Sequence, residues 1–156
     1  TIIQEADDFI MQMRPDWVVF GDLFPQDIPT FLRSGNNGMS IMGRLRARDI
    51  EAGLWQCEMA LMTTYPDFSL RDAHTLISNS VQMVVLVAKM PDGTTRIREV
   101  SEIVKAHDDD YFTIHPIFRH NPQTNRVEAT GYKPQVYDNL GAAGLILPET
   151  LFEPPA

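Results

Sequence analysis

The sequence predicts a protein of the α/β class, formed as a single domain over residues 1–156. Two observations lead to this prediction. Residues 17–20 form a short, continuous apolar run after a helix-proline break, which is typical of a buried strand in a parallel sheet. Later in the chain, β-branched runs alternate with turn residues, which indicates hairpins. We therefore expect an α/β core whose sheet is finished by antiparallel strands.

The first half of the chain alternates expected helices with expected strands. Arg14-Pro15 ends the first helix, because the residue before a proline avoids the α region. Ser69 and Asp72 have the spacing of a capping box, which starts another helix. The expected elements are helices over 1–13, 27–32, 48–64 and 69–80, strands over 17–20 and 39–45, and a loop over 34–38.

The second half is expected to be mostly β. Residues 81–90 form the strongest strand signal of the chain, and the turn Pro91-Asp92-Gly93 joins them to a partner strand over 94–104. A second pair of strands is expected over 111–118 and 126–130. A short helix over 134–141 and a tail over 148–156 complete the chain.

Composition excludes several classes of function. The net charge of −8 argues against nucleic acid as a partner, because phosphate binding needs a basic face. The single cysteine, Cys57, lies in an expected helix interior and is interpreted as a core thiol. The longest apolar run, residues 83–88, is far shorter than the ~20 residues of a membrane span. Because the chain opens on Thr1 and at once has a helical pattern, we expect it to be a piece of a longer protein.

Neither the histidines nor the acidic run of the chain predicts a metal site. His74, His107, His115 and His120 do not pair with a cysteine or a second histidine at the spacing of metal ligands. Asp108-Asp109-Asp110 lacks the glycine and glutamate spacing of a calcium loop and is interpreted as a surface turn. The chain also lacks a recognisable nucleophile elbow.

The strand over residues 17–20 runs into Gly21-Asp22. In nucleotide-hydrolysing α/β proteins, an acid at such a strand end faces the phosphates and holds Mg²⁺ or orients the attacking water. The simpler alternative is a solvated carboxylate. Arg44, Arg46 and Arg48 alternate and would line one face of a strand. They could contact phosphates, form salt bridges to a neighbouring subunit, or lie on a solvated face.

Short motifs that follow one another along essentially the whole chain point to one family. They are Met13-Arg14-Pro15-Asp16 with the following strand and Gly21-Asp22, Gly35-Asn36-Asn37-Gly38, Arg48-Asp49, Ser69-Leu70-Arg71, Ile77-Ser78-Asn79-Ser80-Val81, Asp92-Gly93-Thr94-Thr95-Arg96, Glu128-Ala129-Thr130-Gly131-Tyr132-Lys133-Pro134 and Leu147-Pro148-Glu149-Thr150-Leu151-Phe152. In this order and spacing they resemble the type II and type IV secretion ATPase superfamily, in particular the branch that powers tight-adherence pilus assembly. The first motif matches the Walker B region of that family.

The resemblance implies the C-terminal part of a RecA-like ATPase core with added antiparallel hairpins, without the P-loop half. It implies a parent protein that forms a homohexameric ring in the cytoplasm, at the inner membrane, with secretion or pilus platform proteins as partners. The parent would use ATP and Mg²⁺ if active, whereas this chain alone is expected to hold neither. Asp22 takes the catalytic position, and the residues expected near the nucleotide are Gly21, Gly35, Asn36, Gly38, Arg44 and Arg46.

Departures from the family pattern leave the activity open. Asp22 stands where the family has a glutamate, and Phe24 where it has an arginine. The family's His-Ala-Asn-Ser box falls on Gly43-Arg44-Leu45-Arg46, and the chain contains no Gly-x-x-x-x-Gly-Lys-Ser/Thr. One interpretation is a motor ATPase whose P-loop lies outside this chain. The second is a degenerate, non-catalytic ring or docking component, and a third is a generic α/β interaction module.

Overall fold

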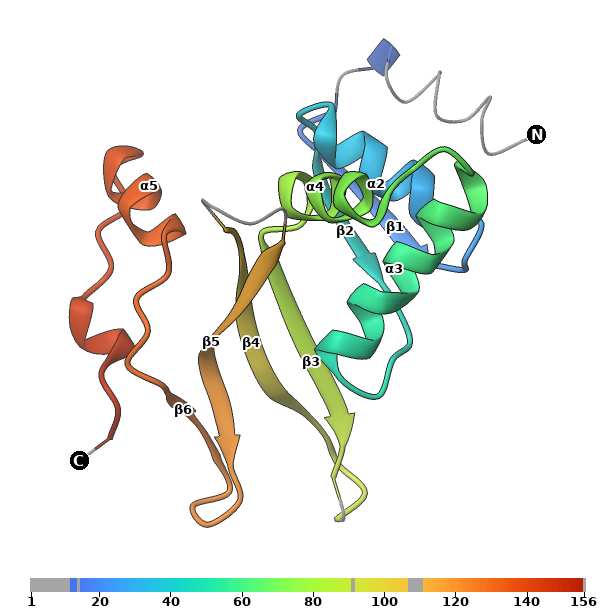
Figure 1. The fold of residues 1–156 in the computed structure, drawn as a ribbon. Helices are drawn as coiled ribbons and strands as arrows, with labels where there is room; N and C mark the ends of the chain where they lie inside the picture. The colour runs from blue at the N-terminus through green and yellow to red at the C-terminus, as the bar shows by residue number, and fades with distance from the viewer. Residues whose placement is uncertain (1–11, 14, 91, 107–110, 156) are drawn as a thin grey trace. The chain divides into compact units, whose positions relative to one another are not determined.

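A computed structural model describes residues 12–13, 15–90, 92–106 and 111–155. The chain divides into two compact units, where a single domain was expected. The first unit contains residues 1–81 and 105–111, and the second contains residues 82–104 and 112–156. Figure 1 shows the elements of each. Most of the helix expected over 1–13, together with His107 and the run Asp108-Asp109-Asp110, falls outside the described residues.

The first unit combines a parallel strand pair with three helices. Its elements are β1 (Trp17–Asp22), α2 (Ile28–Asn36), β2 (Ser40–Arg44), α3 (Ile50–Thr64) and α4 (Leu70–Ser80). β1 and β2 pair in parallel, with Trp17 opposite Ser40 and Asp22 opposite Arg44. The three helices pack against one another, and α2 also packs against β2.

The core of the first unit lies between its helices. Ile28 and Leu32 of α2, Leu61 of α3 and Ile77 of α4 have at most 1% of their surface exposed. The hydroxyl of Ser80 lies 2.6 Å from the carbonyl oxygen of Leu32, which ties the end of α4 to α2. This contact satisfies a buried polar group and fixes how the two helices meet.

Helix starts in the first unit follow their local signals. The carboxylate of Asp49 accepts a hydrogen bond from the Ala52 amide at 2.7 Å and begins α3. Ser69 and Asp72 form the expected capping box at the start of α4, which confirms that prediction. The loop expected over residues 34–38 is wrong in part, because α2 continues to Asn36. Gly38 follows two residues after the helix ends, and its φ of 87° favours glycine.

The parallel pairing of β1 was predicted correctly, but its burial was not. Trp17 and Val19 are 61% and 71% exposed. Phe20 points the other way and packs edge-on against Phe31 of α2, with 5.3 Å between the ring centroids. The helices thus cover one face of the strand, and alternate side chains therefore differ in exposure.

The second unit contains a four-stranded sheet and a C-terminal segment. Its elements are β3 (Met83–Lys89), β4 (Thr95–Lys105), β5 (Phe112–Asn121), β6 (Arg126–Ala129), α5 (Val136–Ala142) and a short 3-10 helix, η1 (Glu149–Phe152). The strand order is β3-β4-β5-β6, and the pairs β3–β4 and β5–β6 are antiparallel. Both expected hairpins are therefore confirmed. The hairpin strands make a sheet of their own and do not extend the β1–β2 pair.

The C-terminal stretch of the second unit is not the tail that the sequence predicts. Phe152 of η1 is 7% exposed and packs against Phe118 of β5 and Tyr137 of α5. On β4, the buried carboxylate of Glu102 accepts hydrogen bonds from the Tyr132 hydroxyl at 2.8 Å and the Gln135 amide at 3.0 Å. These contacts hold residues 130–155 to the sheet.

The mixture of helices and strands is that of an α/β protein, as the sequence predicts. Of the helices among the described residues, none has both the length and the apolar character needed to cross a bilayer.

Candidate functional site

The carboxyl ends of β1 and β2 bring one acid and two arginines together. Asp22 ends β1, Arg44 ends β2, and the two residues are register partners. The Nε of Arg44 donates a hydrogen bond to the Asp22 carboxylate, and Nη2 of Arg46 lies 3.7 Å from its other oxygen. Ligands of open α/β sheets bind outside the carboxyl ends of the strands, so this edge is the candidate site.

The arginines determine the charge state of the acid. The hydrogen bond from Arg44 lowers the pKa of Asp22 below its ordinary value, and the charges of Arg44 and Arg46 act in the same direction. The same hydrogen bond raises the pKa of Arg44. Asp22 therefore stays ionised at neutral pH, but an arginine already satisfies it. Arg44 takes one oxygen of the carboxylate, so a metal ion or a water molecule would compete with Arg44 for Asp22, and the lowered pKa makes Asp22 a weaker base.

The ion pair has a direct titration test. In the chain, the Asp22 carboxyl should titrate below its ordinary pKa of 3.8. Replacing Arg44 with alanine should raise that pKa towards 3.8, and Arg46→Ala should raise it less, because Arg46 is farther away. Any stability that the pair contributes is present above pH 3.8 and lost as the pH falls through the lower folded-state pKa. Carboxyl ¹³C NMR measures the titration midpoint of Asp22 in the wild type and in each variant. An unchanged midpoint in Arg44→Ala would show that the ion pair is absent in solution.

Position 43 is closed by packing. A Cβ atom at Gly43 would lie 2.8 Å from Cδ1 of Leu23 and 2.9 Å from Cε2 of Phe31. Contacts this short force neighbouring atoms to move. The strand beside Asp22 therefore accepts glycine at this position and has no room for a larger side chain without repacking.

The structure separates the other expected site residues into two groups. Gly21 lies next to Asp22 at the carboxyl edge, together with Arg44 and Arg46. Gly35 and Asn36 are the last residues of α2, and Gly38 precedes β2, so these three lie at the amino end of that strand. A five-residue strand spans about 16 Å, so they do not share a site with Asp22.

Gly35 has a packing role at the amino end of β2. A Cβ atom there would lie 2.6 Å from Cδ1 of Ile41 and 3.1 Å from the backbone oxygen of Ser80. The glycine therefore lets α2 approach both β2 and the end of α4.

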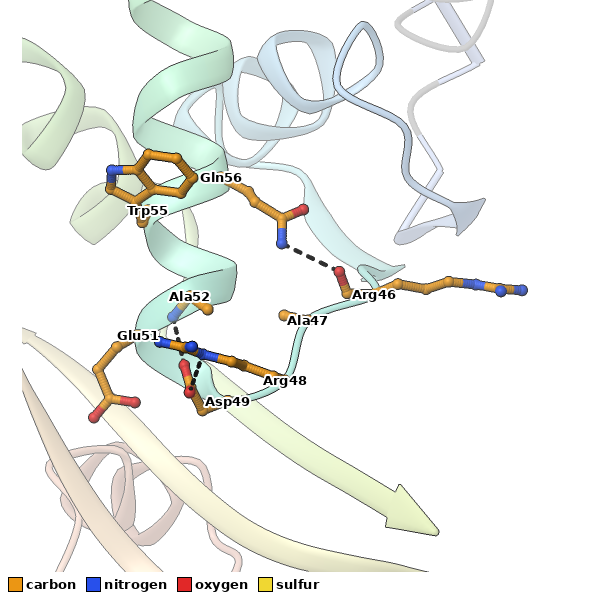
Figure 2. Close-up of a pocket in the computed structure, with 8 residues that line it drawn as sticks. All are labelled: Arg46, Ala47, Arg48, Asp49, Glu51, Ala52, Trp55 and Gln56. Carbon is orange, nitrogen blue, oxygen red and sulfur yellow. Dashed lines mark hydrogen bonds and ion pairs between the residues drawn. The ribbon is translucent and has the colours of Figure 1, made fainter.

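A hollow of about 960 Å³ adjoins the site, and sequence reasoning did not find it. Its lining comes from the segment after β2 and the first turns of α3: Arg46, Ala47, Arg48, Asp49, Glu51, Ala52, Trp55 and Gln56. In Figure 2 the side chains of Arg46 and Trp55 point away from each other. Arg48 donates to Asp49 at 2.9 Å, and Asp49 already caps α3. Arg48 and Asp49 thus pair with each other, and Gln56 donates to the carbonyl oxygen of Arg46 at 3.2 Å, so these groups do not converge on a ligand.

The cysteine and two of the histidines pack against, or hydrogen-bond to, neighbouring side chains of the fold. Burial raises the pKa of the Cys57 thiol to about 12, so it stays protonated and unreactive at neutral pH. The buried His74 ring nitrogen Nε2 lies 2.9 Å from the Glu58 carboxylate. His115 stacks on Tyr132, with 4.6 Å between the ring centroids. In the part of the chain that the structure describes, there is no cluster of three or more side chains that could hold a metal ion.

Comparison with known proteins leaves the family unassigned. No protein-family model matches the chain, and no curated protein matches it significantly.

Proposed function

We propose that this chain is the C-terminal part of a RecA-like secretion ATPase, with degenerate catalytic positions, that serves pilus assembly or protein secretion. The succession of short family-like motifs along the chain supports the proposal. A parallel strand pair with an acid at its carboxyl edge also fits a nucleotide-hydrolysing α/β core. In the complete protein, ATP and Mg²⁺ would be the cofactors if hydrolysis survives.

The main observation in favour of degenerate catalytic positions is the ion pair between Asp22 and Arg44. An acid that holds Mg²⁺ or orients water must present free oxygen lone pairs to the phosphate side. Here an arginine from the neighbouring strand takes one oxygen of the carboxylate, and Arg46 places a second positive charge 3.7 Å from the other oxygen. An aspartate also reaches about 1 Å less far than a glutamate, which can cost ~10²-fold in a positioned reaction.

The surroundings of Gly43 support the same conclusion. The histidine box of the resembled family aligns with Gly43-Arg44-Leu45-Arg46, and a side chain at position 43 would collide with Leu23 and Phe31. Leu23 and Phe31 therefore fill the space that a histidine side chain at position 43 would need. Restoring the histidine alone would not rebuild the site. Phe24, which takes the place of the family's arginine, is 57% exposed and brings no charge.

The proposed setting is the cytoplasmic face of the inner membrane. There the complete protein would form a homohexameric ring that contacts secretion or pilus platform proteins. A ring requires a head-to-tail interface, in which different surfaces of neighbouring copies meet. The net charge of −8 supports protein partners over nucleic acid.

The second candidate is a ring or docking subunit that never hydrolyses ATP. The ion pair at Asp22 and the filled space at position 43 favour this candidate. Assembly of a ring needs neither a free carboxylate at position 22 nor a histidine at position 43. The two candidates differ in one measurable property, which is turnover by the natural full-length protein in which this sequence occurs.

The test is steady-state ATP hydrolysis by that full-length protein and its Asp22→Asn variant. We expect slow turnover that the substitution abolishes, because Asn keeps the shape but lacks the charge. The matched control is Asp67→Asn, an exposed aspartate between α3 and α4 that belongs to none of the family-like motifs. Equal turnover in wild type and Asp22→Asn would rule out a catalytic role for Asp22.

Two further results separate the candidates. A full-length protein that forms rings without turnover would support the docking subunit, whereas one that neither binds ATP nor forms rings would overturn the proposed family role. The isolated chain should bind ATP with a Kd weaker than about 1 mM, because it lacks a P-loop.

A further inference from the structure

The C-terminal segment of the second unit presents an apolar loop to solvent. Leu145 and Ile146, which follow α5, are 60% and 89% exposed, and Leu147 is 37% exposed. Leu151, on η1, is 43% exposed. We call these four side chains the leucine loop. Single exposed apolar residues are ordinary, but four within seven positions concentrate exposed apolar surface in one short segment, and such surface is a feature of partner-binding sites.

The leucine loop is held in place by its own hydrogen bonds. Gly144 has a φ of 84° and ends α5, and the amide of Leu145 donates to the carbonyl of Leu140 at 2.9 Å. The hydroxyl of Tyr137 donates to the carbonyl of Leu147 at 2.7 Å. Phe152, which follows Leu151 in the chain, is buried and anchors the C-terminal end of the leucine loop. The apolar side chains are therefore presented by a fixed backbone, which lowers the entropic cost of binding.

The helix beside the loop is also incompletely covered. α5 (Val136–Ala142) has seven residues, none of which is buried. Isolated helices shorter than about 12 residues are marginal in water, so α5 depends on tertiary contacts. Glu102 supplies one of these, by accepting from the Val136 amide at 3.2 Å. A partner lying across α5 and the leucine loop would bury apolar surface that this unit leaves open.

Acidic side chains accompany the leucine loop in the same C-terminal segment. Asp138 and Glu149 have 81% and 73% of their side chains exposed, and Glu153 is exposed as well. Lys133 is the only basic residue between positions 131 and 155, and its Nζ lies 2.9 Å from the Glu149 carboxylate and 3.9 Å from that of Asp138. Residues 131–155 therefore combine exposed apolar side chains with three carboxylates and one lysine, a net charge of −2.

We propose that the leucine loop and α5 form a docking site for a positively charged amphipathic helix of another protein. Leucine-type side chains on one face of such a helix would pack on the loop, and flanking lysines or arginines would meet Asp138, Glu149 and Glu153. The net negative charge of this segment disfavours anionic lipid and nucleic acid. The charge of −8 on each chain likewise disfavours a second copy. The proposed docking site belongs to the second unit, whereas Asp22 belongs to the first.

The test uses chain 1–156 and a fluorescein-labelled amphipathic peptide of about 18 leucines and lysines, followed by fluorescence anisotropy. We expect binding in the micromolar range that weakens about tenfold in Leu145→Ser/Ile146→Ser. Asp138→Asn/Glu149→Gln should weaken it about threefold, and about 1 M salt should remove that difference. The matched control is Val85→Ser, another exposed apolar side chain of the same unit, and it should bind like wild type.

Three outcomes would overturn the proposal. The first is no binding of the peptide by the wild-type chain. The second is equal binding by wild type and Leu145→Ser/Ile146→Ser, which would mean attraction by charge alone. The third is a shift of the unliganded chain to a dimer in sedimentation that the double substitution abolishes, which would assign the loop to self-association. The side chains of Leu145 and Ile146 are exposed, so an unchanged melting temperature should accompany the double substitution.

Discussion

Replacing Leu32 with alanine should lower the free energy of unfolding of the first unit by about 3 kcal/mol. The Leu32 side chain is fully buried where α2 meets α3 and α4. Its truncation would leave a cavity lined by neighbours that cannot collapse fully, because the Ser80 hydroxyl ties α4 to the Leu32 carbonyl. Urea unfolding followed by tryptophan fluorescence measures the change, because both tryptophans, Trp17 and Trp55, belong to this unit.

The matched control for Leu32 is Met59→Ala. Met59 lies in the middle of α3 with 45% of its surface exposed, so its truncation should change the unfolding free energy by less than about 0.5 kcal/mol. Equal losses in the two variants would show that the interface between α2, α3 and α4 does not carry the stability of this unit.

The second large effect is expected at Glu102 in the other unit. Its buried carboxylate accepts from the Tyr132 hydroxyl and from the amides of Gln135 and Val136. Glu102→Ala would leave these three donors without their acceptor. Each buried unsatisfied group costs about 1–3 kcal/mol, and water can reach part of the opened site, so we expect a loss of about 3 kcal/mol. The amides of residues 130–155 should then exchange roughly 100-fold faster.

Hydrogen exchange with mass spectrometry would locate that effect. Tyr132→Phe removes one of the three donors and should give a smaller loss, of about 1 kcal/mol. Unfolding reported by Trp17 and Trp55 in the first unit should not change in either variant. If residues 130–155 keep wild-type protection in Glu102→Ala, the carboxylate is not what holds them to the sheet.

Much of the local structure follows from sequence signals that act over a few residues. The capping box of Ser69 and Asp72 and the hairpin that joins β3 to β4 need only near neighbours, and both predicted elements occur. The β-branched run over 81–90 likewise becomes strand β3. Where a short segment satisfies its own backbone groups, its sequence is enough to predict it.

Other features depend on residues far apart in the chain, and the sequence did not predict them. Gly35-Asn36 reads as loop by composition, yet both residues stay in α2 because Gly35 packs against Ile41 and Ser80. The segment expected as a tail folds because Phe152 finds Phe118 and Tyr137. Composition describes what a residue prefers alone, and packing overrides that preference when it buries apolar surface.

The candidate site divides in the same way. The sequence by itself predicted a strand over 17–20 that runs into Asp22 and a second strand over 39–45 that contains Arg44, because each follows from a local apolar pattern. Only the tertiary structure decided that these side chains pair, and that Gly35, Asn36 and Gly38 lie at the other edge. Pairing depends on the parallel register of β1 and β2, and register is a property of two strands together that neither strand encodes alone.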